Sequence, residues 1–315
     1  MHISKTIILL LMVNVTSGSY SRGTDKDVLY KNRGYTFPYQ INHPTQTWKL
    51  PDRLIEISGL SYIDKYRLAC IQDEKGNIYI FNLLTGSVER KIDFGENGDY
   101  EDIEIVKNDA WVLKSNGTLY KVKNYLDENE DDVEKYPTIL TKKNDAEGLC
   151  YDPSSKQLLI GCKGHPFYDG KKGKDFKAVY RYNMKTNLLD LEPYLLINLD
   201  FIKDLKDYNT LTQWGVELLA NLDQAKGDLT FQPSALAIHP ITRDIYILAS
   251  VGNLLMVYSP EKKIQTIIHL DTKIHPQPEG ICFSPDGKLY ISNEGKKNSG
   301  RISFFNPKKP TNPGP

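Results

Sequence analysis

Residues 277–293, with the sequence QPEGICFSPDGKLYISN, contain the parts of a β-hairpin in order. A polar, a small and an apolar residue (Glu279, Gly280 and Ile281) open a first strand, and the turn-forming run SPDG follows it. The second strand, KLYISN, is rich in the β-branched and aromatic residues that favour strands.

The polar-small-apolar opening recurs along the chain, which indicates an internal repeat. The intervals between neighbouring first positions are 43, 46, 87 and 45 residues, and three of these match the length of a four-stranded propeller blade. The five openings are Ser58-Gly59-Leu60, Glu101-Asp102-Ile103, Glu147-Gly148-Leu149, Ser234-Ala235-Leu236 and Glu279-Gly280-Ile281.

Second and third strands follow each opening, and four repeats show a fourth, outer strand: VERKIDF, YPTILTK, EPYLLINL and IQTIIHL. The last repeat lacks one, and the strand Gln46 to Leu50 (QTWKL) precedes the first repeat. Because ring closure removes exposed strand edges, we expect this N-terminal strand to complete the last blade. The sequence therefore predicts an all-β fold, a five-bladed β-propeller over residues 45–307.

The interval of 87 residues requires an insertion between blades 3 and 4. Residues 199–231 carry apolar residues at spacings of three and four, which predicts short helices. A degenerate sixth blade is the alternative interpretation.

The flanking segments predict export. Residues 1–19 combine Lys5, a short apolar run (TIILLLMV) and small residues, as in a signal peptide, and the run is too short to span a membrane. A buried N-terminal strand or helix is the alternative. We expect residues 20–44 to be a linker and the Pro-rich residues 308–315 to be a disordered tail.

Composition limits the partners. Forty basic and forty acidic residues give a formal charge of zero, which argues against a nucleic-acid partner.

None of the four cysteines forms a C-x-x-C pair, and we favour buried thiols over disulfides.

The candidate site follows from the repeat, because the first strand of each blade lines the central channel. The aligned first positions Ser58, Glu101, Glu147, Ser234 and Glu279 should meet at one mouth. Three neighbouring Glu side chains either have raised pKa values or are neutralised by a cation. Hard oxygen ligands suit Ca²⁺, or Mg²⁺, which predicts a divalent-cation site. Weaker candidates are Glu56, Asp145, Asp73 and Glu294. The alternative is that each Glu caps a loop or pairs with a Lys.

At these residues the chain resembles a known family. The stretches LIEISGLSY, DAEGLCYDPSSKQLLIGCKG, QPSALAIHP and QPEGICFSPDGKLYISNEG are similar to the SdiA-regulated (YjiK/CarP-like) propellers, over roughly residues 45–306. The resemblance implies a five-bladed, NHL-repeat-like propeller with a calcium site. It also implies a location in the bacterial periplasm or cell envelope, membrane association in some members, and a link to calcium.

Three functions are compatible with this sequence. The first is a calcium-binding, non-enzymatic propeller that presents a face to a protein or small-molecule ligand. The second is a metal-dependent hydrolase of lactones or phosphoesters, by analogy with the more distantly similar gluconolactonase and regucalcin-type propellers. The third is a scaffold whose carboxylates are salt-bridged. The sequence offers carboxylates but no distinct general base, which favours binding over catalysis.

Overall fold

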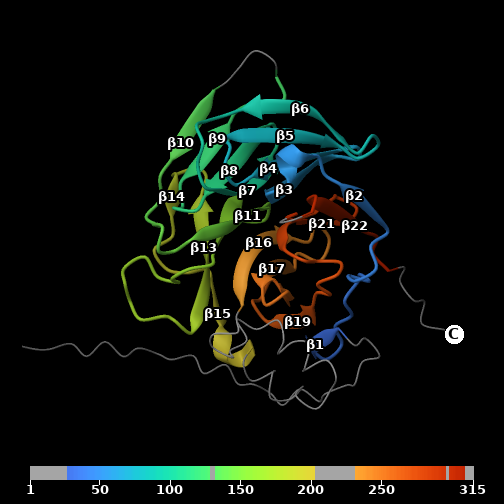
Figure 1. The fold of residues 1–315 in the computed structure, drawn as a ribbon. Coiled ribbons are helices and arrows are strands. Elements are labelled where there is room, and N and C mark those ends of the chain that lie inside the picture. Colours follow the sequence, from blue (N-terminus) through green and yellow to red (C-terminus); the bar gives the residue numbers. More distant parts are fainter. Residues whose placement is uncertain (1–26, 128–131, 203–230, 296–297, 309–315) are drawn as a thin grey trace, which may run out of the picture.

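The computed structural model describes residues 27–127, 132–202, 231–295 and 298–308. Its strands form five antiparallel sheets around a central channel (Figure 1), which confirms the predicted all-β five-bladed propeller. The predicted signal peptide and most of the predicted tail lie outside the described residues. No helix in the described ranges is long and apolar enough to cross a membrane.

The blades follow one another along the chain, each with its innermost strand first. Blade 1 contains β3 (Ile57–Asp64), β4 (Arg67–Gln72), β5 (Asn77–Asn82) and β6 (Ser87–Asp93), and the short 3-10 helix η1 (Asp52–Leu54) precedes it. Blade 2 contains β7 (Tyr100–Val106), β8 (Asp109–Lys114), β9 (Leu119–Val122) and β10 (Val133–Tyr136). Blade 3 contains β11 (Ala146–Asp152), β12 (Gln157–Cys162) and β13 (Phe176–Asn183), and both β14 (Leu188–Leu189) and β15 (Leu195–Asn198) pair with β13.

The last two blades each take a strand from the N-terminal part of the chain. Blade 4 contains β16 (Gln232–Ile238), β17 (Ile245–Val251), β18 (Leu254–Tyr258), β19 (Ile264–His269) and then β1 (Val28–Lys31). Blade 5 contains β20 (Pro278–Phe283), β21 (Leu289–Asn293), β22 (Arg301–Phe305) and then β2 (Gln46–Lys49). Figure 1 shows these two blue strands beside the orange and red C-terminal ones.

Ring closure occurs where the sequence predicts it. Strand β2 pairs antiparallel with β22, with Gln46 opposite Phe304 and Lys49 opposite Arg301. Strand β1 was not predicted, because residues 20–44 were interpreted as a linker. Phe37 and Tyr39 from the same segment are buried, and the Tyr39 hydroxyl donates a 2.6 Å hydrogen bond to the carbonyl of Gly287. The described part of this segment is therefore built into blades 4 and 5.

One outer strand differs from the sequence prediction, and one predicted insertion lies mostly outside the residues that the structure describes. The outer strand of blade 2 is β10, which shares only Tyr136 with the predicted strand YPTILTK. Pro137 comes next and has no N–H to donate to a neighbouring strand. Of the predicted helical insertion, only residues 199–202, which are helical, and Phe231 fall within the described residues.

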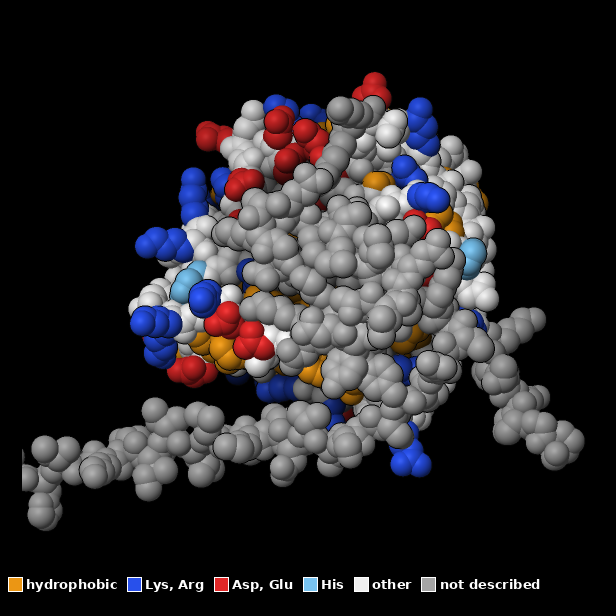
Figure 2. Space-filling model, turned by 60° about the horizontal axis from the view of Figure 1, so that its bottom comes forward, with side chains coloured by type: hydrophobic (Ala, Val, Ile, Leu, Met, Phe, Trp, Pro, Cys, Tyr) orange, Lys and Arg blue, Asp and Glu red, His pale blue; other side chains and the backbone are white. Residues whose placement is uncertain are grey.

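The core lies between adjacent blades. Apolar side chains of facing sheets pack together there, as Trp111 and Leu113 of blade 2 do with Leu158 and Tyr180 of blade 3. All four cysteines are buried with free thiols, as favoured from the sequence. Figure 2 shows both acidic and basic side chains on the described part of one face.

The recurring signature corresponds to a β-bulge in every innermost strand. The pairing of each innermost strand with the next strand shifts register across the first signature position, so that this residue has no partner opposite it. A bulge of this kind turns a side chain away from the regular alternation of a strand. Where the second residue of the signature is Gly, it provides room for the next blade. A Cβ atom on Gly148 would lie 2.9 Å from the backbone nitrogen of Leu236, and one on Gly280 would lie 2.5 Å from the Leu60 side chain.

Gly148→Ala is therefore expected to lower the free energy of unfolding by about 2–3 kcal/mol, because the clash includes backbone atoms of Ala235 and Leu236, which cannot rotate away. Urea denaturation measures this loss. Gly161→Ala is the matched control, since Gly161 lies opposite Gly148 and its Cβ would meet only the Leu236 side chain, at 3.1 Å or more. An equal loss in both variants would contradict the role assigned to the small position.

Candidate functional site

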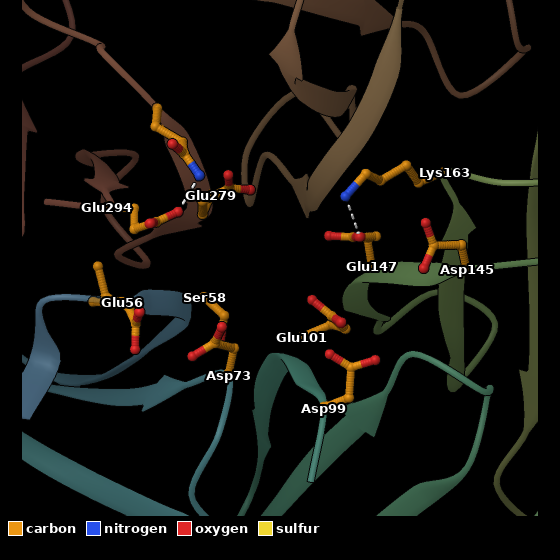
Figure 3. Close-up of a pocket in the computed structure, with 12 residues that line it drawn as sticks. Glu56, Ser58, Asp73, Asp99, Glu101, Asp145, Glu147, Lys163, Glu279 and Glu294 are labelled. Atoms are coloured by element: carbon orange, nitrogen blue, oxygen red, sulfur yellow. Dashed lines mark hydrogen bonds and ion pairs between the residues drawn. The ribbon is translucent and has the colours of Figure 1, made fainter. Parts of the chain in front are cut away.

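A cavity of about 270 Å³ opens at the amino-terminal ends of the innermost strands, and carboxylates surround it (Figure 3). Four blades contribute two carboxylates each, while none of the described residues of blade 4 lines the cavity. We call this cavity the acidic mouth. Its lining comprises Glu56, Ile57, Ser58, Asp73, Asp99, Glu101, Asp145, Glu147, Lys163, Gln277, Glu279 and Glu294.

The three predicted Glu residues meet here. Glu101, Glu147 and Glu279 occupy the bulged positions of β7, β11 and β20, and Figure 3 shows their side chains around one space. The weaker candidates Glu56, Asp145, Asp73 and Glu294 line the same cavity. Glu147 and Asp145, two residues apart, both line the mouth, as do Glu101 and Asp99, and a bulge lies at each of the two Glu positions.

The two predicted serines have different surroundings. Ser58 lines the acidic mouth, is 8% exposed, and its hydroxyl has no hydrogen-bond partner among the described residues. Ser234 does not line the mouth, and its hydroxyl donates a 2.8 Å hydrogen bond to the carbonyl of Pro278. Ser234 thus ties blade 4 to blade 5, whereas Ser58 leaves a neutral oxygen available at the mouth.

Lys163 is the only basic side chain among the described residues of the lining, and the sequence interpretation missed it. Its Nζ lies 2.6 Å from Oε1 of Glu147. Lys163 directly follows the second strand of blade 3, just as Asp73 and Glu294 follow the second strands of blades 1 and 5. Aligning those positions across the repeats would have revealed it.

Backbone hydrogen bonds between loops fix the positions of these side chains. Within blades 3 and 5, the residue after the second strand donates to the loop before the first, from Lys163 to Asp145 and from Glu294 to Gln277. Between blades 1 and 2, Tyr100 N–H donates to the carbonyl of Asp73 at 2.8 Å. The mouth is therefore a ring of interlocked loops.

Burial and mutual repulsion raise the pKa values of the mouth carboxyls. Burial raises the pKa of Glu279 to about 7, with Glu147 adding to the rise. Burial, followed by the charge of Glu56, raises the pKa of Asp73 to about 6. Burial and the nearby Glu147 carboxylate also raise the pKa of Glu101, so the Glu101–Glu147 pair retains a proton while Lys163 supports the charge on Glu147. The mouth thus holds more acid groups than it can ionise at neutral pH without a cation.

The donor set consists of hard oxygens, which are the ligands that Ca²⁺ and Mg²⁺ prefer. As the side chains stand, however, no group of three or more Asp, Glu, His or Cys residues in the described ranges could hold a metal ion. Glu147 is bound to Lys163, and Gln277 donates a hydrogen bond to Glu294. A cation would therefore have to draw carboxylates from these partners or bind partly through water.

Comparison with known proteins identifies relatives by family and by fold. A family model described as SdiA-regulated matches residues 40–297. A search of curated proteins finds no significant match. Among solved structures, glutaminyl cyclase from Myxococcus xanthus is similar over 84% of this chain and 96% of its own, with 11% identity and a TM-score of 0.54. Virginiamycin B lyase from Staphylococcus aureus is similar over 85% of this chain and 74% of its own, with 14% identity and a TM-score of 0.42. At such identities the likeness concerns the fold alone.

Proposed function

Because the chain belongs to the SdiA-regulated family, we propose that it is an exported propeller of the bacterial cell envelope that binds a divalent cation at the acidic mouth. Calcium is the first candidate and magnesium the second. In this proposal the protein is a non-enzymatic binding or scaffold protein, which presents a propeller face to a protein or small-molecule ligand.

The proposal rests chiefly on the charge balance of the acidic mouth. Eight carboxylates and one lysine line about 270 Å³ in the described part of the chain. A divalent cation would offset the burial and mutual repulsion that raise the pKa values of these groups. The unpartnered Ser58 hydroxyl supplies a neutral oxygen beside them, and calcium commonly takes six to eight oxygens of mixed charge.

Calcium is expected to raise the melting temperature of the protein by about 5 °C at 1 mM relative to EGTA, because a ligand that binds only the folded state stabilises it. Differential scanning fluorimetry, with metal analysis of the purified protein, measures this effect. A parallel magnesium titration identifies the preferred ion.

Glu147→Gln and Glu279→Gln should each weaken calcium binding at least tenfold, since each removes one negative ligand. Glu192→Gln, at an exposed position, is the matched control and should respond like the wild type. A wild-type melting temperature that calcium leaves unchanged, together with a metal-free purified protein, would contradict the proposal. Turnover of lactones or phosphoesters that disappears in Glu147→Gln would instead favour the hydrolase alternative.

Export is tested separately, because the predicted signal at residues 1–19 lies outside the described residues. Expression of the full chain in a Gram-negative host should yield a periplasmic form that mass spectrometry finds shortened by about 19 residues. A full-length cytoplasmic product would contradict export. A full-length product in the membrane fraction would show that the segment is retained as an anchor.

A further inference from the structure

A second cavity, of about 260 Å³, lies at the other end of the channel. The first residues of the innermost strands line the acidic mouth, and later residues of the same strands line this cavity. On β3, Ser58 lines the mouth and Ser61 lines the second cavity; the corresponding pairs are Glu101 and Glu104 on β7, and Glu279 and Phe283 on β20. The two cavities therefore lie at opposite ends of the same strands, and we call the second one the carboxyl-end cavity.

The carboxyl-end cavity contains one acid in largely apolar surroundings. Glu104 carries the only carboxyl group among the described residues of its lining, and no Lys, Arg or His lines it. The remaining lining is dominated by aromatic, aliphatic, proline and cysteine side chains. A pocket of this kind, apolar with a few polar groups at fixed positions, is typical of a small-molecule site.

Residues from three blades hold Glu104 in place. The Ser61 hydroxyl on β3 accepts a 3.0 Å hydrogen bond from Ile105 N–H and donates one of 3.2 Å to Oε2 of Glu104. The backbone N–H of Tyr151 on β11 also supports the carboxylate. Burial nevertheless raises the pKa of Glu104 to about 8, because no cationic side chain of the described residues pairs with it.

Aromatic rings form part of the wall. Tyr62, Tyr151 and Phe283 line the cavity. The Phe283 ring is fixed by neighbours, with its centroid 5.0 Å from those of both His239 and Tyr246. Such rings bury the apolar body of a ligand and attract a cation over their faces.

We propose that the carboxyl-end cavity binds a small organic ammonium ion, with its charged group on Glu104 and its apolar body against Tyr62, Tyr151 and Phe283. The charge of the ligand complements the one carboxylate that has no cationic partner. The volume suits a ligand of about ten heavy atoms, near the lower end of small-molecule sites. A bare divalent cation fits less well, because the side chains of the described lining offer one carboxylate and three hydroxyl groups, fewer oxygens than the six to eight that Ca²⁺ takes.

The test uses phenethylammonium and its uncharged analogue 2-phenylethanol as probes, with the full chain, at pH 9 and in EGTA. At this pH both Glu104 and the amine are charged. Isothermal titration calorimetry is expected to show phenethylammonium binding at least tenfold more tightly than 2-phenylethanol. Equal binding of the two probes, or no binding of either, would overturn the proposal without any variant.

Variants locate the site. Glu104→Gln should weaken phenethylammonium binding at least tenfold, whereas Glu192→Gln should bind like the wild type. If Glu104→Gln does not fold, Ser61→Ala keeps the carboxylate but removes its hydrogen bond, and binding should fall several-fold. Unchanged binding in the folded variant would overturn the proposal. Glu147→Gln should bind the amine normally, so failure of the calcium site at the acidic mouth is distinguishable from failure here.

Discussion

Lys163→Met is expected to lower the free energy of unfolding by about 3 kcal/mol at pH 8 in EGTA. The substitution removes the ammonium group that lies 2.6 Å from Glu147, while seven further carboxylates remain around the same cavity. Breaking one partner of a buried ion pair leaves the other charge uncompensated, and such losses reach about 3–5 kcal/mol. Urea denaturation measures the difference.

The same variant should bind calcium at least tenfold more tightly than the wild type, because Lys163 and a cation compete for Glu147. Calcium should therefore restore most of the lost stability. Lys142→Met, at an exposed position, is the control and should leave both the free energy of unfolding and the calcium affinity unchanged. The double variant Lys163→Met/Glu147→Gln should regain stability in EGTA, since the unpaired charge is gone. If Lys163→Met were as stable as the wild type in EGTA and bound calcium no more tightly, the proposed competition between Lys163 and calcium for Glu147 would be wrong.

Raising the pH from 6.5 to 8.5 in EGTA is expected to lower the free energy of unfolding by at least about 3 kcal/mol. Burial raises the folded-state pKa of Glu279 to about 7 and that of Glu104 to about 8, whereas an unfolded Glu has its ordinary value near 4.5. In this window the folded state holds more protons than the unfolded state, so stability falls as pH rises. Each pKa unit corresponds to about 1.4 kcal/mol.

The range from pH 6.5 to 8.5 avoids the titration of groups that make the folded state more stable as the pH rises. Burial lowers the pKa of His275 to about 4, which makes folding less favourable only below the ordinary histidine pKa of 6.5. The pKa of Asp152 is lowered by its hydrogen bonds and by Arg243, so its contribution is lost only under acid conditions. Urea denaturation at half-unit steps measures the slope, and Glu104→Gln should remove a large part of it. If the free energy of unfolding of the wild type did not change over this pH range, these carboxyl groups would not be buried without a cationic partner.

The repeat made the fold predictable, because five aligned openings define both blade length and ring closure. It also brought Glu101, Glu147 and Glu279 together, since equivalent positions of a ring face one mouth. The sequence could not show that the signature is a bulge, because a bulge is defined by pairing with another strand. For the same reason Ser58 and Ser234 looked equivalent, although only Ser58 lines the mouth.

Other features depend on partners that are distant in the sequence. Strand β1 is only four residues long, and its pairing with β19 lies more than 230 residues away, so no local pattern indicates it. Glu104 lies three residues after the first signature position of its blade, so it falls outside the repeated signature. Its role depends on Ser61 and Tyr151 from the blades on either side.

The pairing of β1 and β2 with C-terminal strands also sets the order of folding. Blade 5 cannot be completed until residue 305 has left the ribosome, because β22 is the partner of β2. Until then β2 remains without its neighbour, and the ring stays open.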